Sequence, residues 1–507
     1  MATPLQVYNS LSGKKEAFEP LVAGHIGMYV CGPTVYSDVH LGNCRTFVNF
    51  DVIYRWLLAS GYRVRYVRNI TDVGHLEGDA DSNAEDKISQ RARLEQLEPM
   101  EVVQHYTNGF QEMMRIFNTK KPSIEPRATG HIIEQIEMVK TILDNGLAYE
   151  NNGSVYFDTI KYAERGHYGE LSGRKIEDLL DHTRADLKNQ SEKRHPSDFA
   201  IWIKAADTHL MRWPSPWSVG FPGWHLECSV MSTKYLGKTF DIHGGGGDLK
   251  FPHHENEIAQ NYGACNCAPA RYWLHANMLL MNGKKMSKSD GNSVTPEQLF
   301  TGDSEHLSKG YAPMAVRFFM LQSHYRNTLD LSDTALQAAE KGYHRLMDAY
   351  AVLQHLQHPG GGTEGGLDKQ LNRMLDLARA DMNDDFNTPN ALAKLFAIVP
   401  KINALKAGKE DWTTLTTATL DRLKEEFRLF IFDVFGLQAE TAAAVDPDNA
   451  ESTATPLDGV MELVLELRQS ARTNKDWVTS DQIRDQLNAA GIVVKDGKEG
   501  ASWTVAR

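Results

Sequence analysis

The sequence predicts an α/β fold with a doubly wound parallel sheet, and three observations support this prediction. First, the apolar run IGMYVCG has the composition of a short strand and breaks at Gly32 and Pro33. Second, apolar residues then recur at helical spacing until Gly61, and YRVRYVRNI returns as a strand. Third, the alternation resumes in GWHLECSVMSTKYLG, KTFDIHGGGG and FPHHENEIAQNYGA, and the later residues are largely helical.

Changes in composition and periodicity divide the chain into a large part with an insertion and a small terminal part. The stretch QAETAAAVDPDNAESTATP separates these parts, and HPGGGTEGG reads as a flexible connection between helices. The expected parts are the first half of a Rossmann-type domain at 1–145, an inserted region at 146–212, the second half of that domain at 213–335, a helical bundle at 336–440, a linker at 441–456 and a small α/β domain at 457–507.

The composition is that of a large globular chain. A chain of 507 residues is too long to form a single hydrophobic core, and we expect about three or four domains. No apolar run reaches the roughly eighteen residues of a membrane span, and the first residues lack the apolar core of a signal peptide. Five cysteines, an odd number, argue against a disulfide framework, so we expect a cytoplasmic protein. The net charge of −12 disfavours indiscriminate nucleic-acid binding but permits a local basic surface fitted to one RNA.

The stretch FPHHENEIAQ contains a pattern that suits a metal ion. His253 and Glu257 are four residues apart, so on a helix they share one face. Cys228 lies upstream, and Cys31 ends the first strand, where open α/β sheets place their ligand crevice. Two thiolates, an imidazole and a carboxylate suit tetrahedral zinc. An ordinary surface pair on a helix is the alternative interpretation of His253 and Glu257.

Other residues compete with these four as ligands. We interpret Cys44, Cys265 and Cys267 as bystanders, because the spacing CNC is tighter than the usual two-residue zinc knuckle. His225 could reach the same metal from one turn before Cys228, and we interpret it as a residue that lines the pocket.

Two glycine-containing loops and one lysine-rich loop suggest phosphate binding. TVYSDVHLGNCRT places His40, Gly42 and Asn43 where a strand gives way to a helix, and backbone amides at a helix start favour phosphate. HGGGGD follows a later strand, and KKMSKSDGN supplies cations. Each motif alone has a simpler interpretation as a capping loop or a solvated turn. Together they suit in-line attack on an α-phosphate, which needs positioning and charge neutralisation.

In combination these motifs resemble the class I aminoacyl-tRNA synthetases, and within them the cysteine-specific family. HLGN resembles the HIGH signature of that class, with Leu41 and Asn43 in place of isoleucine and histidine, and KMSKS at 285–289 is similar to its second signature letter for letter. MYVCGPTVY, GWHLEC and DIHGGGGDLKFPHHENE extend the resemblance, which runs from about residue 27 to the C-terminus.

The resemblance implies a ligase that works in two steps. The carboxylate of L-cysteine attacks the α-phosphate of ATP, and the cysteinyl group then passes to the terminal adenosine of tRNA-Cys. The implied catalytic residues are His40, Asn43, Lys285 and Lys288, with His40 at the α-phosphate and the lysines at the β- and γ-phosphates. Magnesium arrives with ATP, and the implied ATP-binding residues are Thr34, His40, Gly42, Asn43, Asp241, His243, Gly244, Gly245 and Lys288.

The resemblance also gives the metal pattern a purpose. It implies one zinc ion per subunit, held by Cys31, Cys228, His253 and Glu257, which binds the thiolate of the substrate. Trp224 and His225 are then expected to line the cysteine pocket. Since zinc prefers a soft thiolate to a hydroxyl, we expect cysteine to be selected over serine without an editing domain.

The small terminal domain resembles the anticodon-binding part of the same family. The matching residues are Arg472, Trp477 and Asp481, where a base can stack on the indole and bond to the charged groups. The alternative is a helix hairpin whose Trp477 belongs to the core. The resemblance favours a monomer that binds tRNA, ATP and L-cysteine and no membrane.

Two other functions are open on the sequence alone. One is a cysteine ligase that delivers cysteine to an amino-sugar acceptor, which residues 457–507 argue against. The other is a non-catalytic, zinc-stabilised RNA-binding protein, which His40 and KMSKS argue against.

Overall fold

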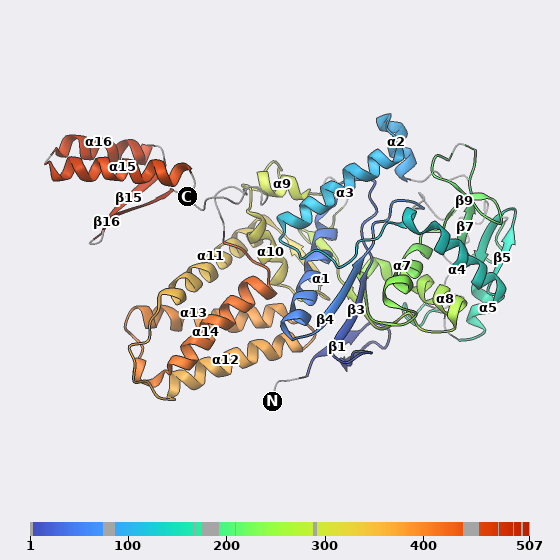
Figure 1. The fold of residues 1–507 in the computed structure, drawn as a ribbon, viewed down its shortest axis with the longest axis horizontal. Helices are drawn as coiled ribbons and strands as arrows, with labels where there is room; N and C mark the ends of the chain where they lie inside the picture. The colour runs from blue at the N-terminus through green and yellow to red at the C-terminus, as the bar shows by residue number, and fades with distance from the viewer. Residues whose placement is uncertain are drawn as a thin grey trace. The chain divides into compact units, whose positions relative to one another are not determined.

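The computed structural model describes residues 4–74, 87–166, 168–174, 192–207, 209–286, 292–439, 456–474, 476–489, 491–497 and 500–505. The chain forms two compact units, Met1–Glu440 and Thr441–Arg507. Figure 1 shows the secondary-structure elements of both units. Among the described helices, none combines the length and the apolar character needed to cross a membrane.

Four parallel strands form the central sheet of the larger unit, which confirms the predicted fold class. Their spatial order is β11 (Ala270–Ala276), β10 (Phe240–Gly246), β3 (His25–Val30) and β4 (Arg63–Arg68). α1 (Leu41–Ala59) lies on one side of the sheet, and α7 (Leu226–Leu236) and α8 (His253–Cys265) lie on the other (Figure 1). Because the chain winds outward from β3 to β4 and from β10 to β11, the carboxyl ends of β3 and β10 border the crevice where such sheets bind ligands.

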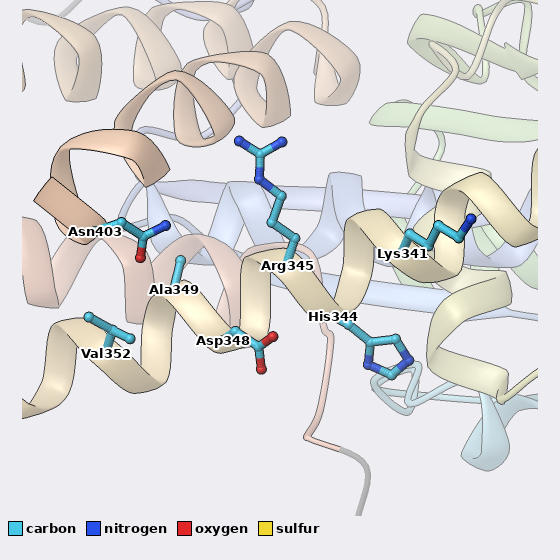
Figure 2. Close-up of a pocket in the computed structure, with 7 residues that line it drawn as sticks. All are labelled: Lys341, His344, Arg345, Asp348, Ala349, Val352 and Asn403. Atoms are coloured by element: carbon cyan, nitrogen blue, oxygen red, sulfur yellow. The ribbon is translucent and has the colours of Figure 1, made fainter. Parts of the chain in front are cut away.

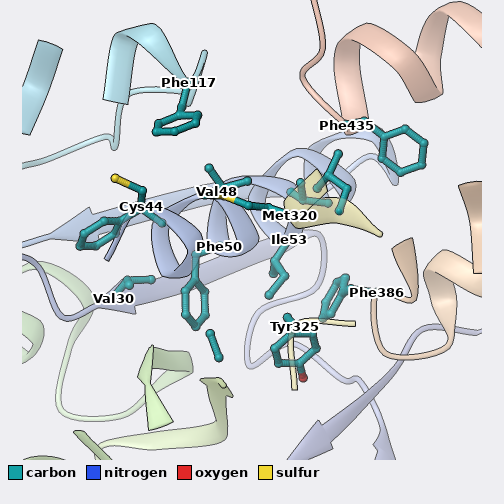
Figure 3. Close-up of a cluster of buried hydrophobic side chains, with 14 of the residues drawn as sticks. Val30, Cys44, Val48, Phe50, Ile53, Phe117, Met320, Tyr325, Phe386 and Phe435 are labelled. Carbon is teal, nitrogen blue, oxygen red and sulfur yellow. The ribbon is translucent and has the colours of Figure 1, made fainter. Parts of the chain in front are cut away.

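α1 is buried along most of its length because it lies between the sheet and later helices. Figure 3 shows Phe50 and Ile53 of α1 in one apolar cluster with Tyr325 and Phe386 from the second half of the unit. Gly244 of β10 permits this packing, since a Cβ atom there would lie 2.2 Å from Phe50 Cε1. The run HGGGGD is therefore glycine-rich partly because a helix approaches the strand closely.

An antiparallel sheet of five strands forms the insertion. Its strands, in spatial order, are β5 (Ala148–Asn151), β6 (Ser154–Phe157), β7 (Phe199–Lys204), β9 (Val219–Pro222) and β8 (Trp213–Pro214). Phe157 and Trp202 belong to a core that this sheet shares with α4 (Ile132–Asp144), α7 and α8. The sheet continues to Pro222, past the boundary expected at residue 212.

The larger unit contains further helices and strands. They are β1 (Gln6–Asn9), β2 (Lys14–Ala17), α2 (Lys87–Glu95), α3 (Pro99–Ile116), α5 (Thr159–Ala163), β12 (Leu279–Met281), β13 (Lys284–Lys285), α9 (Pro296–Thr301), α10 (Pro313–Leu321) and β14 (Leu329–Leu331). β1 and β2 form a hairpin, and β12 pairs with both β13 and β14. β13 therefore fixes the start of the lysine-rich motif in a small sheet.

The last part of the larger unit is helical, as predicted. Its helices are α11 (Asp333–His355), α12 (Gly366–Asn383), α13 (Thr388–Lys406), α14 (Thr417–Arg428) and a π-helical segment, Leu429–Val434. Polar side chains cap the N-termini of α11 and α14: Ser332 accepts the Ala335 N–H, and Thr416 accepts the Thr419 N–H. The HPGGGTEGG stretch joins α11 to α12.

A buried ion cluster, formed by Asp51, Arg55 and Arg317, joins α1 to the end of this helical part. One carboxylate oxygen of Asp51 accepts from Arg55 Nε at 2.7 Å and from Arg317 Nη2 at 2.5 Å. The other oxygen accepts the Lys120 backbone N–H, and Arg317 also donates to the Phe435 carbonyl oxygen. Both charge signs are present and bonded, which is what a stable buried ionic group requires.

The cysteines fall into two groups. Cys31, Cys44 and Cys228 are free and buried, whereas Cys265 and Cys267 form a disulfide with each other at the end of α8. One bridge between residues two apart is a local feature and not a framework that links distant segments.

The smaller unit contains a helix pair followed by a strand pair. Its elements are α15 (Pro456–Thr473), α16 (Trp477–Ala489), β15 (Ile492–Gly497) and β16 (Gly500–Val505). β15 and β16 form an antiparallel hairpin, and Met461 and Ala471 of α15 are buried. This order of two helices and a short strand pair is the one predicted for residues 457–507.

Candidate active site and metal centre

The structure brings together the four residues predicted as metal ligands. Cys31 directly follows β3, Cys228 lies in the first turns of α7, and His253 and Glu257 lie one turn apart on α8. All four side chains are buried, and their ligand atoms lie within 4.8 Å of one another. Cys31 Sγ is 3.5 Å from Cys228 Sγ and 3.5 Å from Glu257 Oε1. His253 Nε2 is 3.2 Å from the same Glu257 oxygen.

The chemistry of these donors fits a cation. Burial raises the pKa of Cys31 well above its ordinary value and that of Cys228 to about 12. Within the described part of the chain, no lysine or arginine forms an ion pair with Glu257. Two thiols and a carboxyl group that are buried together without a protein cation are costly as anions, and a divalent ion would offset that cost. Sulfur, imidazole and carboxylate donors suit zinc.

The predicted pocket residues lie beside this centre. The Trp224 ring is 4.5 Å from the His253 ring between centroids, and His225 Nδ1 is 3.0 Å from His253 Nδ1. Trp224 and His225 are half-buried, whereas the four proposed ligands are buried. The centre is therefore bordered on this side by two half-buried rings.

Glu227 is a further buried acidic residue next to the proposed ligand Cys228, and the sequence analysis did not single it out. Its Oε1 atom accepts hydrogen bonds from the Thr71 hydroxyl and from Asn69 Nδ2, and its Oε2 atom is buried without a partner in the described residues. Burial raises the pKa of this carboxyl group well above its ordinary value. The only signal in the sequence is an acidic residue beside a predicted ligand, Cys228.

His254 and His243 are also part of the centre. His254 Nε2 is 3.3 Å from Cys31 Sγ, and His243 Nε2 is 2.8 Å from Glu257 Oε2. Together with Cys31 and Glu257 they form a second group of donors within 4.8 Å of one another. The sequence analysis assigned no role to His254, although the HH doublet was a signal for it.

Four residues of β10 are predicted to bind ATP, and the structure gives each of them a contact within the protein. His243 is fully buried and stacks on Trp273 with ring centroids 4.3 Å apart, so the structure places it in the metal centre. Asp241 lies near the start of β10, where its carboxylate accepts the backbone N–H groups of Leu21 and Gly27. Gly244 meets Phe50, and a Cβ on Gly245 would lie 2.9 Å from the His254 ring. These four residues thus have packing or hydrogen-bonding contacts within the protein, and their contacts with ATP stay a prediction.

His40 caps α1, in agreement with the predicted strand-to-helix transition. Its Nδ1 atom accepts the Asn43 backbone N–H at 3.3 Å, so the proton of a neutral ring is on Nε2. A Cβ on Gly42 would lie 3.0 Å from the imidazole, and glycine therefore lets the ring lie over the first turn. The side chain is exposed at a helix N-terminus, where backbone N–H groups attract anions.

The remaining predicted nucleotide residues lie on other segments. Thr34 pairs with Thr71 in an isolated parallel bridge next to Glu227. Lys285 is exposed in β13, and its carbonyl oxygen accepts from Asn292 Nδ2 at 3.0 Å. Lys288 lies outside the described residues.

In the smaller unit, Trp477 is 57% exposed at the start of α16, so the interpretation of Trp477 as a core residue is wrong. Arg472 lies in the last turn of α15, and Asp481 of α16 pairs with Arg484 at 3.2 Å. The structure leaves the indole accessible to a stacking partner.

Solved structures with a similar fold define the class. The Mycobacterium tuberculosis methionyl-tRNA synthetase in complex with methionyl-adenylate matches 81% of this chain and 89% of its own, with a TM-score of 0.57 and 15% identity. The Agrobacterium radiobacter K84 agnB2 LeuRS, in a ternary complex with tRNA and LeuAMS, matches 82% of this chain and 85% of its own, with a TM-score of 0.57 and 13% identity. The fold is that of the class I aminoacyl-tRNA synthetases.

Sequence comparisons identify the family within that class. Residues 17–341 match the model of the tRNA synthetases class I (C) catalytic domain, 379–440 the DALR domain, and 456–503 the cysteinyl-tRNA ligase anticodon binding domain. The cysteine--tRNA ligase of Bacteroides thetaiotaomicron is 53% identical over 99% of both chains. That of Deinococcus radiodurans is 48% identical over 98% of this chain and 96% of its own. The chain belongs to the cysteine–tRNA ligase family, which confirms the predicted resemblance and favours it over both alternative functions.

Proposed function

We propose that this chain joins L-cysteine to its cognate tRNA in two ATP-dependent steps, and that a zinc ion selects the amino acid. The convergence of Cys31, Cys228, His253 and Glu257 at the crevice of a class I synthetase fold carries this proposal. The ion would be one per chain, and Mg²⁺ would enter with ATP. The enzyme would act as a monomer in the cytoplasm.

The amino acid would bind with its sulfur at the metal centre and its carboxylate toward α1. When bound, zinc supplies a soft Lewis acid that favours a thiolate over the hydroxyl of serine. Trp224 and His225 would exclude water beside the amino acid, and His225 would orient His253 through the contact between their Nδ1 atoms. Shape alone would discriminate poorly, since cysteine and serine differ by one atom.

Activation would take place at the start of α1. A carboxylate oxygen of cysteine attacks the α-phosphorus of ATP, the bond to the bridging oxygen breaks, and pyrophosphate leaves. His40 would donate its Nε2 proton to a hydrogen bond with an α-phosphate oxygen, because Nδ1 is engaged by Asn43. Lys285 and Lys288 would neutralise the departing pyrophosphate. The ribose hydroxyl of the terminal adenosine would then attack the activated carbonyl and release AMP.

Two surfaces support tRNA as the acceptor. In the smaller unit, the exposed Trp477 would stack on an anticodon base, with Arg472 and Asp481 as its polar neighbours. In the larger unit, a cavity of about 380 Å³ opens between α11 and α13 (Figure 2). The residues that line it are Lys341, His344, Arg345, Asp348, Ala349, Val352 and Asn403. The charges of Lys341 and Arg345 suit a phosphate backbone.

An exchange assay followed by an acylation assay tests the proposal. The purified chain should exchange labelled pyrophosphate into ATP when cysteine is present, and should then acylate bulk tRNA with cysteine. Serine should support exchange at least about a hundredfold more slowly, because the metal contributes to its rejection. No exchange with cysteine would refute the ligase, and equal rates with serine would refute selection by zinc.

A further inference from the structure

Three histidines that are not among the proposed zinc ligands lie directly behind the centre. They are His243 on β10, His254 on α8 and His275 on β11, and each side chain is at least nine-tenths buried. Since adjacent helix positions point in different directions, His253 lies beside Trp224 while His254 lies against the sheet and Trp273. The buried face of the centre therefore has its own set of imidazoles.

His243 holds one oxygen of Glu257. Its Nε2 atom is 2.8 Å from Glu257 Oε2. A carboxylate that binds a metal ion can only accept, so His243 would donate to it through Nε2–H. The stack on Trp273, with an angle of 14° between the rings, fixes the plane of the imidazole. Glu257 Oε1 is then the oxygen that faces Cys31 and His253.

His254 and His275 form a chain that ends on a thiol ligand. His254 Nε2 is 3.3 Å from Cys31 Sγ, and His254 Nδ1 is 2.9 Å from His275 Nε2. With zinc bound, Cys31 would be a thiolate, which can only accept. The proton of His254 would then be on Nε2, and its Nδ1 atom would accept from His275 Nε2–H. Burial lowers the pKa of His275 to about 3, in agreement with a neutral ring that carries one proton. Its Nδ1 atom is buried without a partner in the described residues.

We infer that His243 and the His254–His275 pair are positioning residues of the metal centre, which hold Glu257 and Cys31 in place through Nε2–H donors. This inference rests on the proposed function, because it assigns residues toward the zinc ion. His243 then acts on Glu257, one of the proposed metal ligands. Partners of this kind orient ligands, and their loss commonly weakens metal binding about 10- to 100-fold.

Substitutions by glutamine and asparagine distinguish the effect of the N–H donor from the effect of side-chain volume. The side-chain nitrogen of glutamine reaches about the place of histidine Nε2, and that of asparagine only the place of Nδ1. His275→Gln and His243→Gln should therefore keep the donor, while His275→Asn and His243→Asn should lose it. His324→Asn, which removes a buried histidine bonded to the Asp385 carbonyl oxygen, is the matched control.

The experiment measures the affinity for zinc and not the rate of the catalysed reaction. In competition with a chelator, zinc should bind about 10- to 100-fold more weakly to the Asn variants, and within about threefold of wild type in the Gln variants and the control. The Co²⁺-loaded Asn variants should also show altered absorption bands. Equal zinc affinity in the Gln and Asn variants at both positions would overturn the inference.

A second measurement does not depend on whether the variants fold. In the zinc-loaded wild type with ¹⁵N-labelled histidine, the rings of His243, His254 and His275 should carry a proton on Nε2. A proton on Nδ1 of His254 or His275 would overturn the inference. If the wild type binds no zinc while cysteine-dependent exchange is intact, the zinc part of the proposed function fails, and this inference fails with it. If zinc binds normally and only the tautomers differ, the proposed function stands.

Discussion

Two buried polar clusters of the larger unit differ in how their charges are satisfied. In the ion cluster of Asp51, Arg55 and Arg317, every charged group has a partner of opposite charge or a carbonyl oxygen. The centre around Cys31 and Glu257 contains thiols, carboxyl groups and imidazoles, and within the described residues it includes no arginine or lysine partner for Glu257. Among the residues that the structure describes, Glu227 Oε2 and His243 Nδ1 have no hydrogen-bond partner.

This difference separates a structural cluster from one that is built for a ligand. A buried polar group that is fully bonded stabilises a fold or at least does not weaken it, whereas an incomplete group costs free energy until something completes it. Substitutions in the two clusters should therefore have opposite profiles, one affecting stability and the other affecting metal binding.

The largest effect is expected from Cys228→Ala. The chain should lose its zinc, and cysteine-dependent pyrophosphate exchange should fall at least about 10³-fold, equivalent to about 4 kcal/mol in the barrier. Cys44→Ala, which removes a buried thiol outside the centre, should keep the metal. Metal analysis and exchange rates on both variants measure this, and a zinc-loaded, active Cys228→Ala protein would contradict the assignment.

The opposite profile is expected from Asp51→Asn. Two buried guanidinium groups would lose their shared counter-charge, and the free energy of unfolding should fall by about 3–5 kcal/mol. The zinc content of the folded fraction should not change. Denaturant unfolding with metal analysis tests this, and a loss of zinc without a loss of stability would remove the distinction between the clusters.

A smaller, pH-dependent effect is expected at Asp385, whose carboxylate is also fully partnered, by Tyr325 and Arg326. Burial lowers the pKa of the neighbouring His324, even though Asp385 opposes that shift. The unfolded chain therefore takes up a proton at about pH 6.5 that the folded chain does not, so stability should fall as the pH drops below about 6.5. His324→Asn should flatten this slope, and identical slopes in both proteins would show that His324 does not cause it.

The smallest effect is expected from exposed lysine and arginine side chains, which extend the comparison from buried charges to charges on the surface. The double variant Lys341→Gln, Arg345→Gln should raise the KM for tRNA about three- to tenfold and reduce the salt dependence of binding by about two counterions. Exchange with cysteine and ATP should not change. Lys369→Gln, Arg373→Gln removes the same charge at the same spacing from α12 and serves as the control. Equal KM values for tRNA in both double variants would show that the cavity between α11 and α13 does not bind tRNA.

The sheet and three of the four proposed ligands could be predicted because they depend on local patterns and one general rule. His253 and Glu257 follow from helical spacing, and Cys31 follows from its place at the end of a strand in a doubly wound sheet. The fold places Cys228 beside Cys31 although 197 positions separate them. Only the resemblance to a family could anticipate that contact.

Other residues could not be assigned because their roles depend on rotation and packing. Whether His253 or His254 faces the pocket depends on how α8 is turned against the sheet, and the sequence shows only a doublet. His243 follows a strand pattern that suits a nucleotide loop, yet its ring is covered by Trp273. Asp51 and Arg317 are 266 positions apart, and no local signal connects them.

The contact between Gly244 and Phe50 has a consequence for the length of the amino acid. In the proposed function, the sulfur of cysteine would bind near α8 and the end of β3, and its carboxylate near the start of α1. α1 meets β10 at this glycine. An added methyl group at position 244 would push the helix away from the strand and widen the gap between the two sites. Because glycine has no side chain, position 244 would keep the two proposed sites close together. That spacing would suit cysteine and disfavour a homologue that is one methylene longer.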